Sequence, residues 1–165
     1  FNTRVRAAFE LLEERVERRE IGVFGCATWN GLRTPPGSRG HLSLAELVEL
    51  AREAGGAGHH FRVVQLPISL LMTEAVRAPT QRLADGRVVP LLHAAAELGV
   101  SVIASASLLQ AQLAAGLPPQ VHEAFPGLTT DAQRALAFVR GLPLAAALVG
   151  MRSPGHVDEN LDAAR

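Results

Sequence analysis

Four short apolar segments, each separated from the next by a helical pattern, constrain the fold of this chain more than any other feature. They cover residues 21–26 (IGVFGC), 61–66 (FRVVQL), 100–104 (VSVIA) and 144–149 (LAAALV). Their largely continuous apolar character is typical of strands that are covered on both faces of a sheet. Because parallel neighbours need a long crossover that is usually helical, this β–α order predicts a parallel sheet.

The helices between these strands are predicted from apolar spacing and capping signals. Val5, Phe9, Leu12 and Val16 recur at helical spacing in the first segment. Capping boxes are expected at Ser43 with Glu46, opening a helix that ends at 55–56, and at Thr130 with Gln133, opening a helix over 131–140. Further helices are expected over 88–98, over 107–115 and after Ser153, whereas residues 30–40 form a loop and 68–86 lack a clear period.

Four such βα units make half of a parallel (β/α)₈ TIM barrel. We therefore predict one α/β domain over residues 1–165 with the fold of a half-barrel. A doubly wound open sheet is the competing architecture, but the glycine-rich GxGxxG loop that usually accompanies it is absent.

Composition narrows the classes of function. The chain is 48% hydrophobic and 19% charged, which indicates a globular domain, and 16 acidic residues balance 16 basic ones, which argues against nucleic-acid or anionic-membrane partners. A single cysteine, Cys26, favours a reducing cytoplasm, and no apolar run has the roughly 18 residues that a membrane span requires. No metal site is expected, because His59 and His60 lack ligands at metal spacing and are interpreted as loop histidines.

Polar residues at the ends of the predicted strands are the candidates for function, because parallel α/β proteins bind ligands there. Gln65 interrupts an apolar strand, and it would bind either a ligand amide or the backbone of the barrel. Ser105 and Ser107 suit a phosphate at a helix start, or form an ordinary cap. Around Gly150, Arg152 and Ser153 three anion-favouring features coincide, although a capped helix with a solvated arginine would have the same sequence.

The segments GVFGCATWNGLR, FRVVQLP, VSVIASASLLQ and LVGMRSPGHVDENL resemble, in this order, strands five to eight of the aldo-keto reductases. The resemblance covers essentially the whole chain, and the last segment is the most specific. It implies the C-terminal half of a (β/α)₈ barrel from an oxidoreductase that reduces carbonyl compounds with NADPH, less often NADH, without a metal.

The resemblance also implies a set of cofactor contacts. Thr28 and Gln65 correspond to residues that hold the nicotinamide carboxamide, and Ser105 stands where a tyrosine often stacks on the ring. The turn that binds the pyrophosphate corresponds to Ala106, Ser107, Leu108 and Gln110. The 2′-phosphate and adenine contacts correspond to Gly150, Met151, Arg152, Ser153, His156 and Asn160. An arginine is common at the position of His156, so Arg152 is the reason to prefer NADP over NAD.

The catalytic aspartate, tyrosine, lysine and histidine of that family come from the other half of the barrel. This chain has no tyrosine, and all 16 of its basic residues are arginines, so it carries no catalytic residue of that set and is expected to be inactive alone.

We predict a fragment of an NAD(P)H-dependent aldo-keto reductase that supplies the cofactor-binding half for a small carbonyl substrate. The alternatives are a non-catalytic subunit of this type that binds a cofactor or partner, and another barrel enzyme that binds a phosphate. Unpaired strands at the two sheet edges predict self-association or marginal stability.

Overall fold

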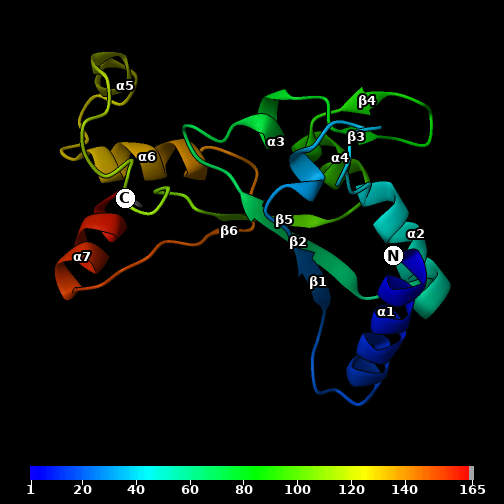
Figure 1. Cartoon of the computed structure of the whole chain (residues 1–165). Coiled ribbons are helices and arrows are strands. Elements are labelled where there is room, and N and C mark those ends of the chain that lie inside the picture. The colour runs from blue at the N-terminus through cyan, green and yellow to red at the C-terminus, as the bar shows by residue number, and fades with distance from the viewer. Residues whose placement is uncertain (164–165) are drawn as a thin grey trace. The chain divides into compact units, whose positions relative to one another are not determined.

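The computed structural model describes residues 1–163, so that Ala164 and Arg165 at the end of the predicted domain lie outside the described residues. The elements follow one another along the chain as in Figure 1. The helices are α1 (Asn2–Glu17), α2 (Leu44–Gly55), α3 (Glu74–Arg77), α4 (Leu91–Glu97), α5 (Pro119–Ala124), α6 (Asp131–Arg140) and α7 (Pro154–Asp162), with single 3₁₀ turns η1 (Gly31–Arg33) and η2 (Gly56–Gly58). The strands are β1 (Phe24–Ala27), β2 (Phe61–Pro67), β3 (Gln81–Arg82), β4 (Val88–Val89), β5 (Ser101–Ser105) and β6 (Ala146–Ala147).

The main sheet has four strands in the order β1-β2-β5-β6. β1 pairs in parallel with β2, and β5 pairs in parallel with β6, which confirms the predicted α/β class and its parallel sheet. The fourth strand was predicted over 144–149, but only Ala146 and Ala147 pair, with Ile103 and Ala104. The first strand also starts later than predicted, at Phe24, because the preceding Gly22 and Val23 are exposed.

Gly25 allows β1 to approach β2 closely. The register between the two strands shifts between Phe24 and Gly25. A Cβ atom built at Gly25 would lie 1.9 Å from the carbonyl oxygen of Val63, so no other residue fits without moving the backbone. A glycine inside a strand commonly marks such an irregularity.

The described chain forms two compact units, and the first comprises residues 1–65 and 74–102. In this unit α1 packs against α2. Phe9 of α1, Phe24 of β1 and Phe61 of β2 form an aromatic cluster with ring centroids 5.2 to 6.1 Å apart. Buried aromatic rings at such distances contribute both apolar burial and a specific edge attraction. The cluster therefore fixes the amphipathic face of α1, predicted from its spacing, against the β1–β2 pair.

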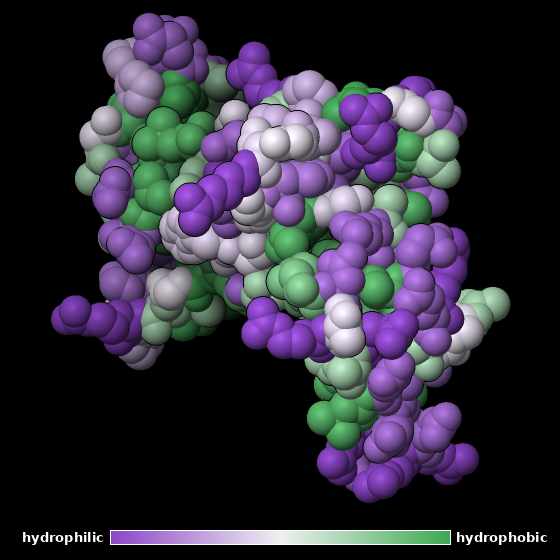
Figure 2. Space-filling view, turned by 45° about the vertical axis from the view of Figure 1, so that its right-hand side comes forward, coloured by the Kyte–Doolittle hydropathy of each residue, from purple (hydrophilic) through white to green (hydrophobic). Residues whose placement is uncertain are grey.

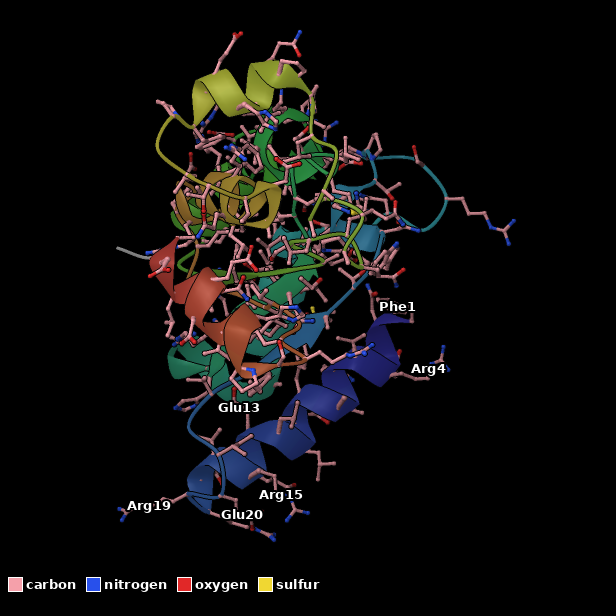
Figure 3. All side chains as sticks on the ribbon, turned by 90° about the vertical axis from the view of Figure 1, so that its left-hand side faces the viewer. Phe1, Arg4, Glu13, Arg15, Arg19 and Glu20 are labelled. Carbon is pink, nitrogen blue, oxygen red and sulfur yellow. The ribbon has the colours of Figure 1, made fainter. Side chains whose placement is uncertain are left out.

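A buried carboxylate joins α1 to the start of β2. Glu13 accepts hydrogen bonds from the backbone N–H of His60 and from its Nδ1, both at 2.7 Å. Figure 3 shows Glu13 directed toward the body of the unit, whereas Arg4 and Arg19 extend away from it. The neighbouring His59 is buried, and this burial lowers the pKa of its imidazole. His59 and His60 lie between η2 and β2, outside regular structure, as interpreted from the sequence, and the carboxylate that binds His60 comes from the distant helix α1.

Buried Gln81 holds the long loop between β1 and α2. Its Nε2 donates to the carbonyl oxygens of Leu32 (2.9 Å) and Leu42 (3.2 Å), and its Oε1 accepts from the backbone N–H of Leu44 at 2.8 Å. The side-chain hydroxyl of Thr80 also donates to Leu32. One buried amide thus satisfies backbone groups of a loop that has no regular partner, as buried polar groups require.

The helix predicted over 88–98 begins only at Leu91. Val88 and Val89 instead pair antiparallel with Gln81 and Arg82 across a turn at Gly86, whose φ is +87°. Pro90 is the N-cap of the helix. Proline disfavours helical conformation in the residue before it, so Val89 stays extended and the helix begins after Pro90. This small antiparallel sheet was not predicted.

The second unit comprises residues 66–73 and, of those described, 103–163. The helix predicted over 107–115 is absent, and the chain there forms consecutive turns. α5 was not predicted. The capping box at Thr130 and Gln133 is complete, whereas at Ser43 in the first unit only the serine half forms, because Glu46 accepts a hydrogen bond from Asn2 instead.

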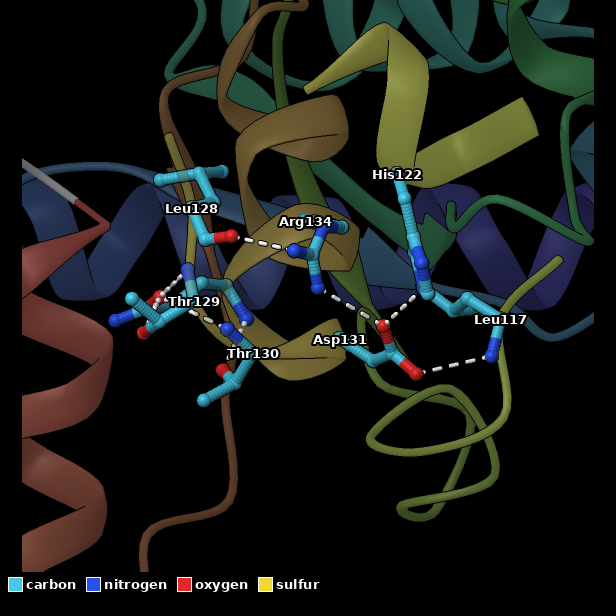
Figure 4. Close-up of polar contacts among 8 residues, drawn as sticks. Leu117, His122, Leu128, Thr129, Thr130, Asp131 and Arg134 are labelled. Carbon is cyan, nitrogen blue, oxygen red and sulfur yellow. Dashed lines mark hydrogen bonds and ion pairs between the residues drawn. The ribbon is translucent and has the colours of Figure 1, made fainter. Parts of the chain in front are cut away.

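Asp131 connects α5 and α6 with the turn that precedes them. Its carboxylate accepts hydrogen bonds from the backbone N–H of Leu117, from His122 Nε2 and from Arg134 (Figure 4). Arg134 in turn donates to the carbonyl oxygen of Leu128. The Leu117 N–H, followed by His122, holds the pKa of the Asp131 carboxyl below its ordinary value.

The surface is mixed in character. Figure 2 shows hydrophobic residues reaching solvent between hydrophilic ones. Large exposed hydrophobic side chains include Val23, Trp29, Leu148 and Met151. Within residues 1–163, no helix has the length and apolarity needed to cross a membrane.

The aromatic cluster should dominate the stability of the first unit. We expect Phe61→Ala to lower the free energy of unfolding by about 3–5 kcal/mol, because a fully buried ring is replaced by a cavity. Leu11→Ala, on the exposed side of α1, is the matched control and should change it by less than about 0.5 kcal/mol. Urea denaturation followed by circular dichroism measures both. Equal losses in the two variants would refute a central role for the cluster.

Asp131 should make the stability of the second unit depend on acid pH. Since its pKa is lowered by folding, the carboxylate stabilises the folded state above the ordinary pKa of roughly 3.9, and this contribution disappears as pH falls through the folded-state value. Asp131→Asn should therefore be less stable than the wild type at neutral pH, with the difference shrinking below about pH 4. Urea titrations across this range, with exposed Asp158→Asn as control, test the prediction; a difference independent of pH would contradict it.

Candidate functional site

A cleft of about 970 Å³ lies in the second unit, between the turns that follow β5 and the segment that follows β6. Residues of two predicted phosphate-binding segments form its walls. The lining residues that were predicted from the sequence are Ala106, Ser107, Leu108, Gln110, Gly150, Met151, Arg152, Ser153 and His156, and the others are Ala111 and Leu148. Two segments about 40 residues apart in sequence therefore meet at one concave surface.

The turns after β5 hold an unusual backbone conformation. Ala106, Leu109, Gln110 and Ala111 have φ values of 53°, 45°, 53° and 68°, in the left-handed region that side chains with a Cβ disfavour. Each such residue costs on the order of 1–2 kcal/mol, and strain of this kind concentrates at binding sites. In residues 1–163, the backbone N–H groups of Ser107, Leu108 and Gln110 donate no hydrogen bond within the chain. Successive free N–H groups in such turns make concave sites for anions.

Ser107 carries the least satisfied polar group of this cleft. Its side chain is only 1% exposed, and its Oγ has no hydrogen-bond partner in the described part of the chain. A buried hydroxyl without a partner costs on the order of 1–3 kcal/mol. The predicted helix start at Ser107 was wrong, but Ser107 is among the residues that line the cleft.

The second wall of the cleft is the start of α7. Ser153 caps the helix, its Oγ accepting from the backbone N–H of His156 at 3.4 Å, as predicted. The ring Nδ1 of His156 accepts from the backbone N–H of Arg152 at 3.4 Å. Arg152 itself is exposed, and the lining contains no acidic residue. An arginine beside a helix N-terminus, without a competing carboxylate, favours an anionic ligand.

Gly150 leaves space at this wall. A Cβ built there would meet no atom within 4 Å, and its φ is not in the left-handed region. The fold of this chain alone therefore does not require a glycine. Its absence of a side chain instead keeps the cleft open next to Arg152.

Asn160 lies apart from the other predicted contacts of α7. It lines a second cavity of about 430 Å³ in the same unit, between α6, β6 and α7. This cavity is mainly apolar, with Leu136, Leu144 and Leu161 in its walls, and Met151 lines both cavities. Asn160 thus places an amide in an apolar cavity that adjoins the cleft at Met151.

Thr28 and Gln65 meet in the first unit, at the ends of the parallel pair β1–β2. Ala27 and Gln65 are register partners, and the backbone N–H of Thr28 donates to the carbonyl oxygen of Gln65 at 2.9 Å. The Thr28 hydroxyl accepts from the backbone N–H of Gly31 and keeps its own hydrogen to donate. The side-chain amide of Gln65 forms no hydrogen bond with any residue of the described range. The sequence left two interpretations of Gln65, a ligand amide or the backbone of the barrel as its partner. Within the described residues the structure provides no backbone partner for this amide.

Ser105 ends β5, and its carbonyl oxygen accepts from the backbone N–H of Ile68 at 3.0 Å. It is not among the residues that line the cleft. The structure therefore does not bring Ser105 together with the predicted pyrophosphate turn.

The loop after β1 is more ordered than its sequence suggested. The Arg33 guanidinium donates to the Trp29 carbonyl oxygen and to Asn30, and it forms an ion pair with Glu74 at 2.8 Å. The Trp29 indole on this loop is 53% exposed. Sequence reasoning overlooked Arg33, because its ion-pair partner lies in the distant helix α3. Only the spacing of Trp29, Asn30 and Arg33 could have pointed to it.

Cys26 and the histidines do not form a competing site. Burial raises the pKa of the Cys26 thiol, which keeps it protonated and poorly nucleophilic near neutral pH. Among residues 1–163 no group of three or more histidine, cysteine, aspartate or glutamate side chains could hold a metal ion.

The fold is similar to that of solved aldo-keto reductases. A thermostable aldo-keto reductase, Tm1743, crystallised with the inhibitor epalrestat, matches 97% of this chain at 16% identity with a TM-score of 0.63. The match covers 49% of that protein, so this chain spans about half its length. The apo and holo forms of aldo-keto reductase AKR11C1 from Bacillus halodurans match 98% of this chain at 13% identity, covering 62% and 61% of that protein, with TM-scores of 0.47 and 0.48. No family model and no curated protein matches the sequence.

At such low identity the match to Tm1743 is a statement about the fold. The chain has the α/β fold of about half of an aldo-keto reductase barrel. The resemblance inferred from the four strand segments is thereby confirmed for the architecture.

A glycine substitution in the left-handed turns after β5 should not lower the free energy of unfolding. Ala111→Gly should leave the free energy of unfolding unchanged or raise it by up to about 1 kcal/mol, because glycine adopts a φ of 68° without a steric penalty. Ala137→Gly, inside α6, is the matched control and should lower it by about 1 kcal/mol. Urea denaturation of both variants tests this conformation. A loss at Ala111 as large as that at Ala137 would show that the left-handed turn is not formed.

Proposed function

We propose that this chain is the cofactor-binding half of an NAD(P)H-dependent aldo-keto reductase. The single observation that carries the proposal is the cleft that joins the turns after β5 to the start of α7, with Ser107 Oγ buried and without a partner in its wall. The predicted phosphate contacts come from both of these segments. Their agreement in one cleft supports a ligand with a phosphate group.

The chemistry of the donor set fits a dinucleotide phosphate. Ser107 Oγ and the free backbone N–H groups of Leu108 and Gln110 would donate to pyrophosphate oxygens. Arg152 would bind a second anionic group through its fixed fork of N–H donors, next to the capped start of α7. All of these groups are donors, and none is a carboxylate that would repel a phosphate.

Arg152 is the reason to propose NADP rather than NAD. A 2′-phosphate distinguishes the two cofactors, and an exposed guanidinium without a carboxylate in the same cleft is suited to it. Asn160 would contact the adenine from the adjoining apolar cavity, where Met151 provides a wall common to both cavities. NAD remains the alternative if Arg152 does not contact the ligand.

Thr28 and Gln65 would bind the amide of the nicotinamide. The Thr28 hydroxyl retains a hydrogen to donate, and the Gln65 amide offers both a donor and an acceptor, so the pair complements a carboxamide. Ser105 cannot stack on a ring as an aromatic residue would. When bound, the cofactor supplies a hydride for reduction of a carbonyl substrate.

This chain would supply binding and orientation, but not the tyrosine and lysine of the catalytic set that the resemblance implies. It has no tyrosine or lysine, so a carbonyl substrate would be reduced only where another segment or chain contributes those groups. The alternative function, a non-catalytic cofactor-binding subunit, is favoured by this same absence. Because the one cysteine cannot form an intrachain disulfide, we propose the cytoplasm as the compartment.

NADPH binding to the chain tests the proposal directly. Titration should quench the fluorescence of Trp29, the only tryptophan, and calorimetry should give a saturable isotherm. Arg152→Ala should raise the Kd for NADPH by about tenfold or more, the equivalent of one lost charge-assisted hydrogen bond, and the Kd for NADH by less than about threefold. Ser107→Ala should weaken both cofactors similarly while leaving the unliganded chain no less stable, because it removes an unsatisfied hydroxyl.

Arg39→Ala, on the exposed loop before α2, is the control for loss of one positive charge and should bind like the wild type. If the Arg39 and Arg152 variants lost the same affinity for NADPH, the loss would reflect net charge and not a contact of Arg152 with the cofactor. Absence of saturable binding by the folded chain would refute the proposal.

A further inference from the structure

The cleft of the second unit is lined by one side chain whose charge changes near neutral pH. Among its lining residues only Arg152 and His156 can carry a positive charge, and none is acidic. A guanidinium stays charged at every pH of interest, whereas an imidazole gains or loses its charge between about pH 5 and 8. The positive charge of this cleft therefore depends on the protonation of His156.

A hydrogen bond holds the neutral form of His156 against the neighbouring turn. The ring Nδ1 accepts from the backbone N–H of Arg152 at 3.4 Å, and since that N–H can only donate, Nδ1 must be unprotonated. Protonation of Nδ1 would break this bond, because two donors cannot share a hydrogen bond. The same wall would then offer two further donors to an anion, the Nδ1–H of His156 and the released N–H of Arg152.

The surroundings of His156 supply no negative partner for its protonated form. The charged residues of α7, and of α6 that packs against it, are Asp158, Glu159, Asp162, Asp131, Arg134 and Arg140. None of them forms an ion pair with His156 in the described part of the chain. The turns after β5, residues 106–117, contain no charged side chain. Because the helix dipole also disfavours a cation at the start of α7, an anionic ligand would provide the partner that protonated His156 lacks.

We propose that His156 makes the choice between NADPH and NADH depend on pH, by binding the 2′-phosphate beside Arg152 only when it is protonated. The inference rests on the proposed function, since it takes the ligand of the cleft to be a dinucleotide. Because the protonated form binds the anion more tightly, binding of NADPH near neutral pH takes up a proton from the solvent onto His156. The contribution of His156 to NADPH affinity is therefore largest below about pH 6 and is lost above about pH 8.

The ligand titrates in the same range with the opposite sign. A phosphate monoester gains its second proton near about pH 6, and the resulting monoanion binds a cation less tightly than the dianion. Acid pH therefore weakens NADPH binding through the phosphate while it strengthens binding through His156. The two effects separate in the ratio of dissociation constants between a His156 variant and the wild type, because the titration of the ligand is common to both proteins.

Calorimetric titration of NADPH and NADH into the wild type and His156→Gln, at about pH 6 and about pH 8.5, measures this ratio. For NADPH we expect His156→Gln to raise the Kd about fivefold or more at the acid pH and less than about twofold at the alkaline pH. For NADH, which has no 2′-phosphate, the two proteins should agree within about twofold at both. At neutral pH, buffers of different ionisation enthalpy should show that NADPH binding takes up more protons in the wild type than in the variant.

Two further variants act as controls. His156→Arg places a permanent charge at the same position and should bind NADPH more tightly than the wild type at about pH 8.5, where His156 itself is neutral. His93→Gln removes an exposed histidine that does not line the cleft, and it should bind both cofactors like the wild type at both pH values.

The outcomes distinguish this inference from the proposed function. If both cofactors bind but the NADPH ratio for His156→Gln is the same at both pH values, the inference is wrong and the proposed function stands. Equal weakening of NADH and NADPH would also overturn it, because His156 would then contact a group that the two cofactors share. Absence of saturable binding at either pH would refute the proposed function and this inference together. Should His156→Gln fail to fold, an unchanged NADPH affinity of His156→Arg at about pH 8.5 would decide against the inference.

Discussion

Parallel strand pairing is the constraint on which the rest of this structure depends. Because two adjacent strands run in the same direction, the chain must return through a crossover, and the residues that follow both strands come to the same edge. Thr28, which follows β1, meets Gln65 near the end of β2 in this way. The turns after β5 meet the start of α7, which follows β6, in the same way. Neither pair of segments is close in sequence. The location of the candidate site is thus a consequence of strand direction and not of any local motif.

The candidate site also concentrates the unfavourable features of the second unit. Left-handed backbone at Leu109, Gln110 and Ala111, a buried hydroxyl at Ser107 and N–H groups without acceptors all occur within six residues. Each feature has a cost in the unliganded chain, and a phosphate would offset each of them with hydrogen bonds. The complete capping box at α6 and the aromatic cluster around Phe61 lie outside the cleft. Strained backbone and unsatisfied groups that occur together in this way are common at binding sites.

The sequence predicted the framework better than the site, for physical reasons. Apolar periodicity located α1, capping signals located the starts of α2 and α6, and continuous apolar runs located the central strands, because each of these signals is local in sequence. The helix expected over 107–115 is absent although its residues have adequate helix propensity. The tertiary fold overrides that propensity and holds Leu109 to Ala111 in left-handed turns. The helix expected from Val88 began at Leu91, because pairing with Gln81 and Arg82 competed with helix formation. Gln81 could not be recognised as a support of the β1–α2 loop, since all its partners are backbone groups, which no sequence pattern specifies. Arg33 was missed because its ion-pair partner, Glu74, lies 41 residues away in sequence. The predicted contacts around Gly150 to His156 do share one cleft, and there the capping signal at Ser153 was local and therefore readable.

Ligand binding would act on a deficit that the fold itself leaves in the second unit. Within residues 1–163, Ser107 Oγ and the backbone N–H groups of Ser107, Leu108 and Gln110 have no acceptor. Anything that binds only the folded state raises its apparent stability by mass action, so an anionic ligand in the cleft would stabilise the fold. Leu148 and Met151 follow β6 and also line the cleft. A ligand bound there would therefore order the segment after β6 together with the turns after β5, and the two walls of the cleft would become stable as one unit.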